Sequence, residues 1–150
     1  MNIREFERGD TLKLSHLLAD CFQALHSKGY IESKMETKLS RRQMERFSET
    51  DKNAVSFVAT MNNSVIGTCG YSDGMLHPLF IDISLVGRGI GRALVTQVVE
   101  HARKRANQPL ETWSTVFTEN FFMSFGFQTK REIYLPNGFQ NLYLRKMMLK

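Results

Sequence analysis

Residues 79–101 read LFIDISLVGRGIGRALVTQVVEH, an apolar stretch followed by three alternate glycines and a helix-like pattern. Gly87, Gly89 and Gly91 stand where a predicted strand over 79–83 gives way to a predicted helix. Glycine is unfavourable at an ordinary position because it loses more conformational freedom on folding than any other residue. A tight turn needs only one glycine with positive φ, so three at alternate positions indicate a corner that requires bare backbone.

The apolar residues after the glycines recur at the spacing of a helix of about 16 residues: Ile90, Leu94, Val95, Val98, Val99 and Ala102. Backbone N–H groups at such a helix start, free of Cβ atoms, converge on an anion, and the helix dipole adds to the attraction. Arg88 and Arg92 bring cationic donors to the same corner. The pattern fits neither a G-x-G-x-x-G dinucleotide fingerprint nor a G-x-x-x-x-G-K-[ST] phosphate loop. The corner therefore predicts a site for a diphosphate.

Before this corner, we expect a strand over 2–7 and polar helical segments within 31–47. Between them, we expect a helix of about 17 residues capped by Asp10, with apolar residues at helical spacing: Leu14, Leu17, Leu18, Cys21, Phe22 and Leu25. Strands over 54–61 and 65–71 are joined by a turn at Asn62-Asn63, and Gly74 ends that hairpin.

After the corner, we expect a strand over 110–115, a short helix reaching Ser124 with Gly126 as its cap, and a strand opening at Phe127. That strand turns at 136–138 and returns over 139–147. The predicted order β-α-α-β-β-β-α-β-α-β-β favours an α/β or α+β fold, with helices packed on a mixed sheet.

Composition predicts one cytoplasmic domain spanning 1–150, because a chain of 150 residues with 42% hydrophobic content can bury a core of its own. Cys21 and Cys69 fit no redox or zinc motif, and the 4 histidines have no metal-site spacing. No apolar run is long enough for a membrane span, and the charged N-terminus does not resemble a signal peptide. The net charge of +5 is typical of an ordinary surface, and no nucleic-acid-binding signature accompanies it.

Residues 79–94 resemble motif A of the GNAT superfamily of acetyl-CoA-dependent N-acetyltransferases, a strand followed by [RQ]-x-x-G-x-[GA]. The stretch ENFFMSFGF (119–127) is similar to the family's motif B in its FF-x3-GF form, and the tail GFQNLYLRKMMLK is similar to the usual final strand. The FF form together with a long first helix resembles a subgroup of small bacterial acetyltransferases.

The resemblance implies a GNAT fold, a mixed and mostly antiparallel six- to seven-stranded sheet with helices on both faces. It also implies direct transfer of an acetyl group from acetyl-CoA to a primary amine of a small molecule or peptide, without a metal. An acyl-CoA-binding sensor with little catalysis is the alternative, and a homodimer stays open. The sequence identifies neither the acceptor amine nor the oligomeric state.

The same resemblance implies the cofactor-binding residues: Phe80, Ile81, Val86, Gly87, Arg88, Gly89, Ile90, Gly91, Arg92, Thr115 and Phe122. Val86 replaces the customary Gln or Arg, so backbone amides must carry most of the binding. Phe122 stands where many relatives have a tyrosine that protonates the leaving thiolate, and two aromatics before a Gly-Phe cap are equally consistent with a core. Tyr71 and Tyr134 are other proton donors to weigh, against an ordinary packing role.

The reaction needs a base, because an alkylammonium with a pKa near 10.4 is almost fully protonated at neutral pH. His77 is the first candidate, since an imidazole titrates close to neutrality and His77 shares strand parity with Leu79 and Ile81. Glu111 is the second and Asp82 a third, each open to a structural interpretation as a solvated or capping carboxylate. His26 and Tyr30 stand where this fold usually forms its acceptor wall.

Overall fold

The computed structural model describes residues 1–29, 38, 40–45, 54–77, 79–105, 109–115, 118–134 and 143–149. Its helices are α1 (Thr11–Ser27), α3 (Ile90–Arg105) and α4 (Glu119–Met123), with 3-10 turns η1 (Arg8–Asp10) and η2 (Ile83–Leu85). Its strands are β1 (Asn2–Glu5), β2 (Ala54–Met61), β3 (Ser64–Ser72), β4 (Met75–Leu76), β5 (Phe80–Ile81), β6 (Leu110–Thr115), β7 (Gln128–Tyr134) and β8 (Tyr143–Leu149). Residues 38 and 40–45 are also helical.

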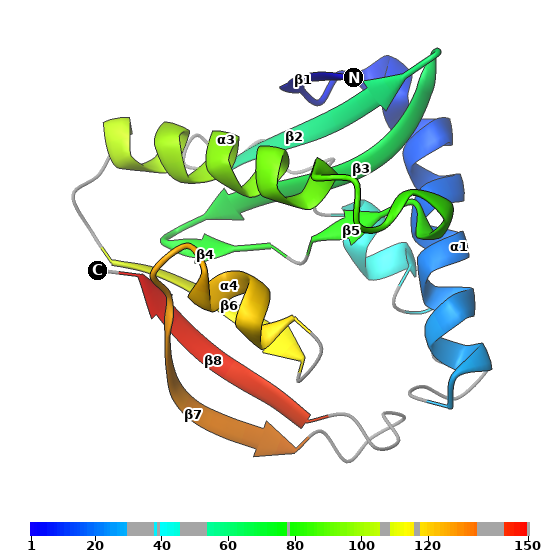
Figure 1. Ribbon diagram of the computed structural model, residues 1–150. Coiled ribbons are helices and arrows are strands. Elements are labelled where there is room, and N and C mark those ends of the chain that lie inside the picture. Colours follow the sequence, from blue (N-terminus) through cyan, green and yellow to red (C-terminus); the bar gives the residue numbers. More distant parts are fainter. Residues whose placement is uncertain are drawn as a thin grey trace.

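The described strands form one sheet in the order β1-β2-β3-β4-β6-β8-β7, with β5 also paired to β3 (Figure 1). Every pairing is antiparallel except that of β4 with β6. This confirms the mixed, mostly antiparallel sheet. The sheet has 8 strands rather than six or seven, because β4 and β5, of two residues each, are counted separately.

The two long helices pack on opposite faces of the sheet, as predicted. Alternate residues of β2 face different helices: Phe57 and Ala59 join the core beneath α3, whereas Val58 joins the core beneath α1. From α3 the buried side chains are Ile90, Leu94, Val95, Val98 and Ala102, and from α1 they are Leu14, Leu17, Leu18 and Phe22. The 3.6-residue spacing in the sequence therefore identified the buried face of both helices.

The parallel pair β4–β6 is the irregular point of the sheet. Its only register pair is Met75 with Glu111, reinforced by the bond from the Glu111 N–H to the Gly74 carbonyl at 2.8 Å. Farther along, β5 pairs with β3 and not with β6, and Figure 1 shows β5 and β6 diverging. The sheet thus opens between β5 and the far end of β6, beside the start of α3.

The segment between β4 and β5 contains one extra residue relative to β3. Leu76 pairs with Tyr71, so the paired numbers add to 147, whereas Phe80 pairs with Thr68 and Ile81 with Gly67, so they add to 148. A shift of one residue reverses which face a side chain occupies. The predicted strand over 79–83 is accordingly shortened to Phe80–Ile81.

Several boundary predictions are confirmed. α1 has the predicted length of 17 residues, β2 spans 54–61, and Asn62 and Asn63 take φ values of 50° and 64° in the hairpin turn.

The predicted cap of α1 is wrong. Asp10 precedes α1, but its carboxylate does not cap that helix and instead accepts bonds from Arg4 and from the Glu7 N–H. The predicted turn at 136–138 lies outside the described residues, as do residues 139–142 of the last predicted strand. Among the residues described, no helix is long and apolar enough to span a membrane.

Candidate active site at the strand–helix corner

The glycine corner, residues 86–92, connects η2 to the first turn of α3. Gly87 and Gly89 have φ values of 88° and 84°, while Arg88 between them is not in the positive region. Side chains rarely adopt positive φ, so these two positions require glycine. Alternation of the sign of φ turns successive N–H groups toward one side, which forms a concave anion site. The corner therefore supplies converging donors at a helix N-terminus.

The space around these two glycines is open. A Cβ atom built on Gly87 or Gly89 would have no neighbour within 4 Å. Gly91 differs, because its Cβ would lie 3.1 Å from Leu79 Cδ2 and 3.5 Å from the Phe121 ring. The first two glycines thus set backbone conformation, and the third permits close packing against α4.

The remaining corner residues play unequal parts. Val86 is 68% exposed, so its side chain is available to solvent, whereas the Ile90 side chain is buried in the core and only its backbone faces the corner. Arg88 is exposed beside the glycines. Arg92 is directed at the residues that follow α4: its Nη2 donates to Oγ of the C-cap residue Ser124 at 2.8 Å, and its guanidinium lies 4.8 Å from the Phe125 ring centroid. Sequence reasoning missed these two partners, 32 and 33 positions away.

His77 lies in the irregular segment between β4 and β5. Its N–H donates to the Gly70 carbonyl at 2.8 Å, and its Nε2 lies 3.0 Å from Ser72 Oγ. The predicted parity with Leu79 and Ile81 is wrong, because those two residues pack beneath α3 on the same side as Leu76, the neighbour of His77. The extra residue before β5 is the cause, and it puts His77 on the face opposite α3.

Glu111 occupies the same face as His77. On β6 the alternate residues Leu110, Thr112 and Ser114 are buried, so Glu111 and Trp113 point to the other side. Glu111 is half-buried and sits at the junction with β4. The two leading candidates for the base therefore lie on one face, beside the opening of the sheet.

Asp82 has a structural role. Its Oδ1 accepts bonds from the N–H and hydroxyl of Ser84 at 2.9 and 2.7 Å, which caps η2 just before the corner. The capping interpretation is the one the structure favours for this residue.

Two aromatic candidates are core residues. Phe122 is 4% exposed and packs edge to face against Phe127, with ring centroids 5.6 Å apart, so its ring has almost no surface for a ligand and the core interpretation fits it better. Tyr71 is 7% exposed, with its hydroxyl 3.4 Å from His101 Nδ1. Phe121, half-buried, is the aromatic that reaches the first turn of α3.

Some of the other predicted residues are half-buried, and some lie outside the described part of the chain. Phe80 and Ile81 are half-buried in β5 and face α1 and α3 respectively. His26 is half-buried in the last turn of α1. Tyr30 and the side chains of Thr115 and Tyr134 lie outside the described residues.

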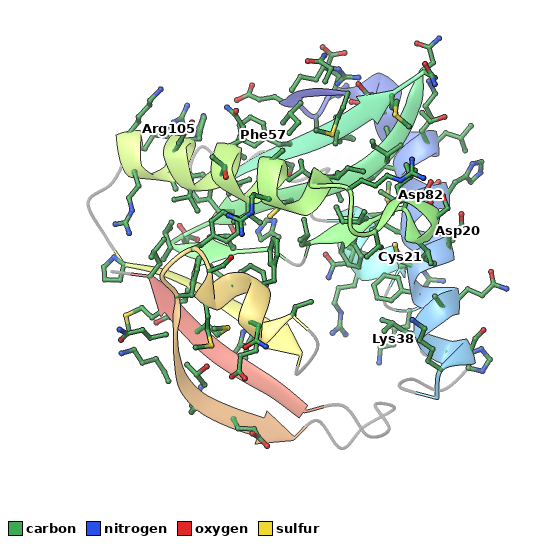
Figure 2. The ribbon with its side chains drawn as sticks, viewed as in Figure 1. Asp20, Cys21, Lys38, Phe57, Asp82 and Arg105 are labelled. Carbon is green, nitrogen blue, oxygen red and sulfur yellow. The ribbon has the colours of Figure 1, made fainter. Side chains whose placement is uncertain are left out.

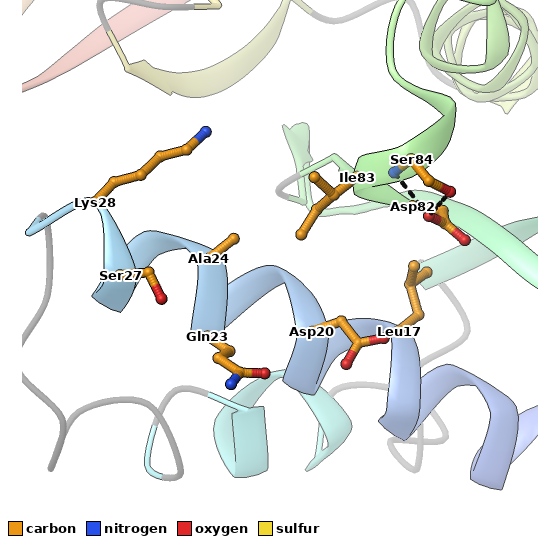
Figure 3. Close-up of a pocket in the computed structure, with 9 residues that line it drawn as sticks. All are labelled: Leu17, Asp20, Gln23, Ala24, Ser27, Lys28, Asp82, Ile83 and Ser84. Atoms are coloured by element: carbon orange, nitrogen blue, oxygen red, sulfur yellow. Dashed lines mark hydrogen bonds between the residues drawn. The ribbon is translucent and has the colours of Figure 1, made fainter.

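A pocket of about 580 Å³ lies between α1 and η2 (Figure 3). It is lined by Leu17, Asp20, Gln23, Ala24, Ser27, Lys28, Asp82, Ile83 and Ser84. Neither His77 nor Glu111 lines it, so it lies beside the candidate site rather than within it. It shares only the capped turn, Asp82 to Ser84, with the approach to the corner.

The cysteines are poor nucleophiles here. Burial, with smaller contributions from Asp20 and Asp82, raises the pKa of Cys21 to about 11 (Figure 2). Burial also raises the pKa of Cys69 to about 12. Both thiols are thus protonated at neutral pH. Within the described part of the chain, no cluster of three or more His, Cys, Asp or Glu residues could hold a metal ion.

A family model for the acetyltransferase (GNAT) domain matches residues 22–147. The chain therefore belongs to the GNAT family of acetyltransferases. The family and fold predicted from the sequence are confirmed, while the FF-x3-GF subgroup remains a prediction.

Relatives agree with this class. An uncharacterized N-acetyltransferase of Methanocaldococcus jannaschii is 31% identical over 88 residues, which are 57% of this chain and 39% of that protein. Ribosomal-protein-alanine N-acetyltransferase from Brucella melitensis matches with a TM-score of 0.78 over 99% of both chains, at 19% identity. PaiA N-acetyltransferase from Thermoplasma acidophilum, in complex with coenzyme A, matches with a TM-score of 0.75 over 97% of this chain and 98% of that one, at 12% identity. The structural matches support the fold.

Proposed function

We propose that this protein transfers an acetyl group directly from acetyl-CoA to a primary amine of a small molecule or peptide. The observation that carries the proposal is the glycine corner, where Gly87 and Gly89 have positive φ with open space around them at the start of α3. A diphosphate fits such a cradle, because its charge matches converging N–H groups and a helix N-terminus. Binding of the related PaiA enzyme to coenzyme A supports the same donor.

In this proposal, different residues of the chain bind different parts of acetyl-CoA. The corner holds the diphosphate, and Arg88, exposed beside it, adds a cationic donor. Phe80 and Ile81 border the opening between β5 and β6, where the pantetheine arm would lie. Bound acetyl-CoA supplies an activated thioester.

His77 is the proposed base, with Glu111 second, since both lie on one face beside that opening. A base there removes the proton that keeps the amine from acting as a nucleophile. Ser72 Oγ, 3.0 Å from Nε2, fixes the orientation of the imidazole ring.

A thiol-release assay with acetyl-CoA and a panel of amines tests this function. The panel includes a polyamine, an aminoglycoside, free amino acids, peptide N-termini and a lysine peptide. Release that depends on one class of amine supports direct transfer and identifies the acceptor. Tight binding of acetyl-CoA without release for any class contradicts it and favours the sensor alternative.

A further inference from the structure

The Arg92 side chain connects the first turn of α3 to the C-terminal end of α4, where Ser124 is the C-cap residue and Phe125 follows it. Its Nη2 donates to Ser124 Oγ at 2.8 Å, and Ser124 Oγ in turn donates to the Phe121 carbonyl at 2.5 Å. The guanidinium also lies over the Phe125 ring at 4.8 Å.

The contact has a second, apolar part. The Phe121 ring packs edge to face on Phe125, with centroids 5.3 Å apart, and reaches the Gly91 backbone, where an added Cβ would lie 3.5 Å from it. A side chain at position 91 would therefore push on Leu79 and Phe121. Gly91 and Arg92 together bring α4 against the start of α3.

The contact joins two helices that follow diverging strands. α3 follows β5 and α4 follows β6, the two strands that diverge. In the described structure β5 and β6 share no register pair, so the relative placement of α3 and α4 depends on side chains such as these.

We propose that Arg92 is a positioning residue that fixes α4 relative to the glycine corner, rather than a ligand of the diphosphate. This proposal rests on the proposed function. Under it, Arg92 aligns the two walls between which the pantetheine arm lies, and Arg88 is the arginine that meets the phosphates. The two arginines of the motif thus have different tasks.

Calorimetric titration with two ligands distinguishes phosphate binding from positioning of α4, and it needs no amine substrate. ADP carries the diphosphate without the pantetheine arm, and acetyl-CoA carries both. For Arg92→Ala we expect acetyl-CoA affinity to fall roughly fivefold to tenfold, with ADP affinity within twofold of wild type. For Arg88→Ala we expect both affinities to fall by a similar factor. Lys104→Ala, which removes an exposed charge from the last turn of the same helix, should change neither.

Variants of the partner make the assignment specific. Ser124→Ala should reproduce the Arg92→Ala pattern, and Arg92→Ala combined with Ser124→Ala should bind acetyl-CoA no more weakly than Arg92→Ala alone. Arg92→Lys, which keeps a cation over Phe125, should recover most of the acetyl-CoA affinity.

Equal losses of ADP and acetyl-CoA affinity in Arg92→Ala would overturn the proposal and make Arg92 a phosphate ligand. Unchanged acetyl-CoA affinity in that variant, or in Ser124→Ala, would overturn it as well. A wild-type protein that binds neither ligand defeats the proposed function before any variant is compared, and the role of Arg92 fails with it.

Discussion

At the scale of single residues, His77 makes a hydrogen bond through its backbone and a polar contact through its ring. The backbone N–H of His77 donates to the Gly70 carbonyl, and the hydroxyl of Ser72 lies within hydrogen-bonding distance of the imidazole ring. A general base must come within hydrogen-bonding reach of the proton that it removes, so an imidazole held in one orientation beside the opening of the sheet suits that role. Kinetics distinguish a base at this position from a histidine that only packs.

We predict that His77→Ala lowers kcat about 10²- to 10⁴-fold and leaves the Kd for acetyl-CoA within twofold, because a base acts on the amine and not on the donor. Ser72→Ala should lower kcat less, since the imidazole remains and only its orientation is lost. The measurement is thiol release with the accepted amine, together with calorimetry for the donor. His16→Ala, an exposed histidine on α1, is the control. Full turnover by His77→Ala excludes this base and makes Glu111→Gln the next variant to measure.

At the scale of elements, α3 lies close to β3 because Gly67 has no side chain. A Cβ there would lie 2.9 Å from Leu94 Cδ1, 3.0 Å from Ile81 Cδ1 and 3.2 Å from Ile90 Cγ2. Those three side chains belong to α3 and β5, the two elements that flank the glycine corner. The spacing between helix and sheet therefore sets where the corner lies.

We expect Gly67→Ala to lower the free energy of unfolding by about 1–3 kcal/mol, the usual effect of overpacking a core. Gly9→Ala is the matched control, because no atom lies within 4 Å of its added Cβ, and it should stay within about 0.5 kcal/mol of wild type. Urea denaturation measures both. Equal stability of the two variants would mean that α3 relaxes away from β3 without loss.

A second element-scale link joins β1 to the start of α1. Asp10, 6% exposed, accepts two bonds of 2.8 Å from the Arg4 guanidinium. These bonds, together with the bond from the Glu7 N–H, lower the pKa of the Asp10 carboxyl, and burial opposes them only in part. β1 thus depends on a charged pair as well as on its pairing with β2.

The lowered pKa predicts the direction of a pH effect. The unfolded carboxyl has a pKa near 3.9, so the pair's contribution is fully present above that value and is lost as the pH falls through the lower folded pKa. Asp10→Asn should lower the free energy of unfolding at pH 7 by about 1–3 kcal/mol, and by less at pH 3. Urea denaturation at the two pH values provides the comparison. An identical loss at both would show that the charge of Asp10 contributes nothing.

At the scale of the whole molecule, local patterns predicted most of the fold. The apolar spacing of α1 and α3 and the paired asparagines of the hairpin act within a few residues, so their outcome could be anticipated. The shift between β4 and β5 could not, because pairing with β3 determines it. The Asp10 carboxylate likewise turns to Arg4, a partner six positions earlier, instead of capping its own helix.

Only part of the candidate site could be predicted from the sequence. The glycine corner follows from the motif, since the need for positive φ is visible in the residue types themselves. The core position of Phe122 and the contact of Arg92 with Ser124 depend on how α4 packs, which no local spacing reveals. Sequence therefore located the corner, and the three-dimensional packing distinguished the residues around it.

The central claim is that bare backbone at the glycine corner binds the diphosphate of acetyl-CoA. Titration calorimetry of wild type and Gly89→Val with acetyl-CoA tests it most directly, because position 89 has a φ of 84° and open space, so valine perturbs the backbone conformation and not the core. Circular dichroism checks that the variant remains folded. We predict one site in wild type and no measurable binding to the folded variant. Absence of heat with wild type, or equal affinity in the two proteins, would contradict the account.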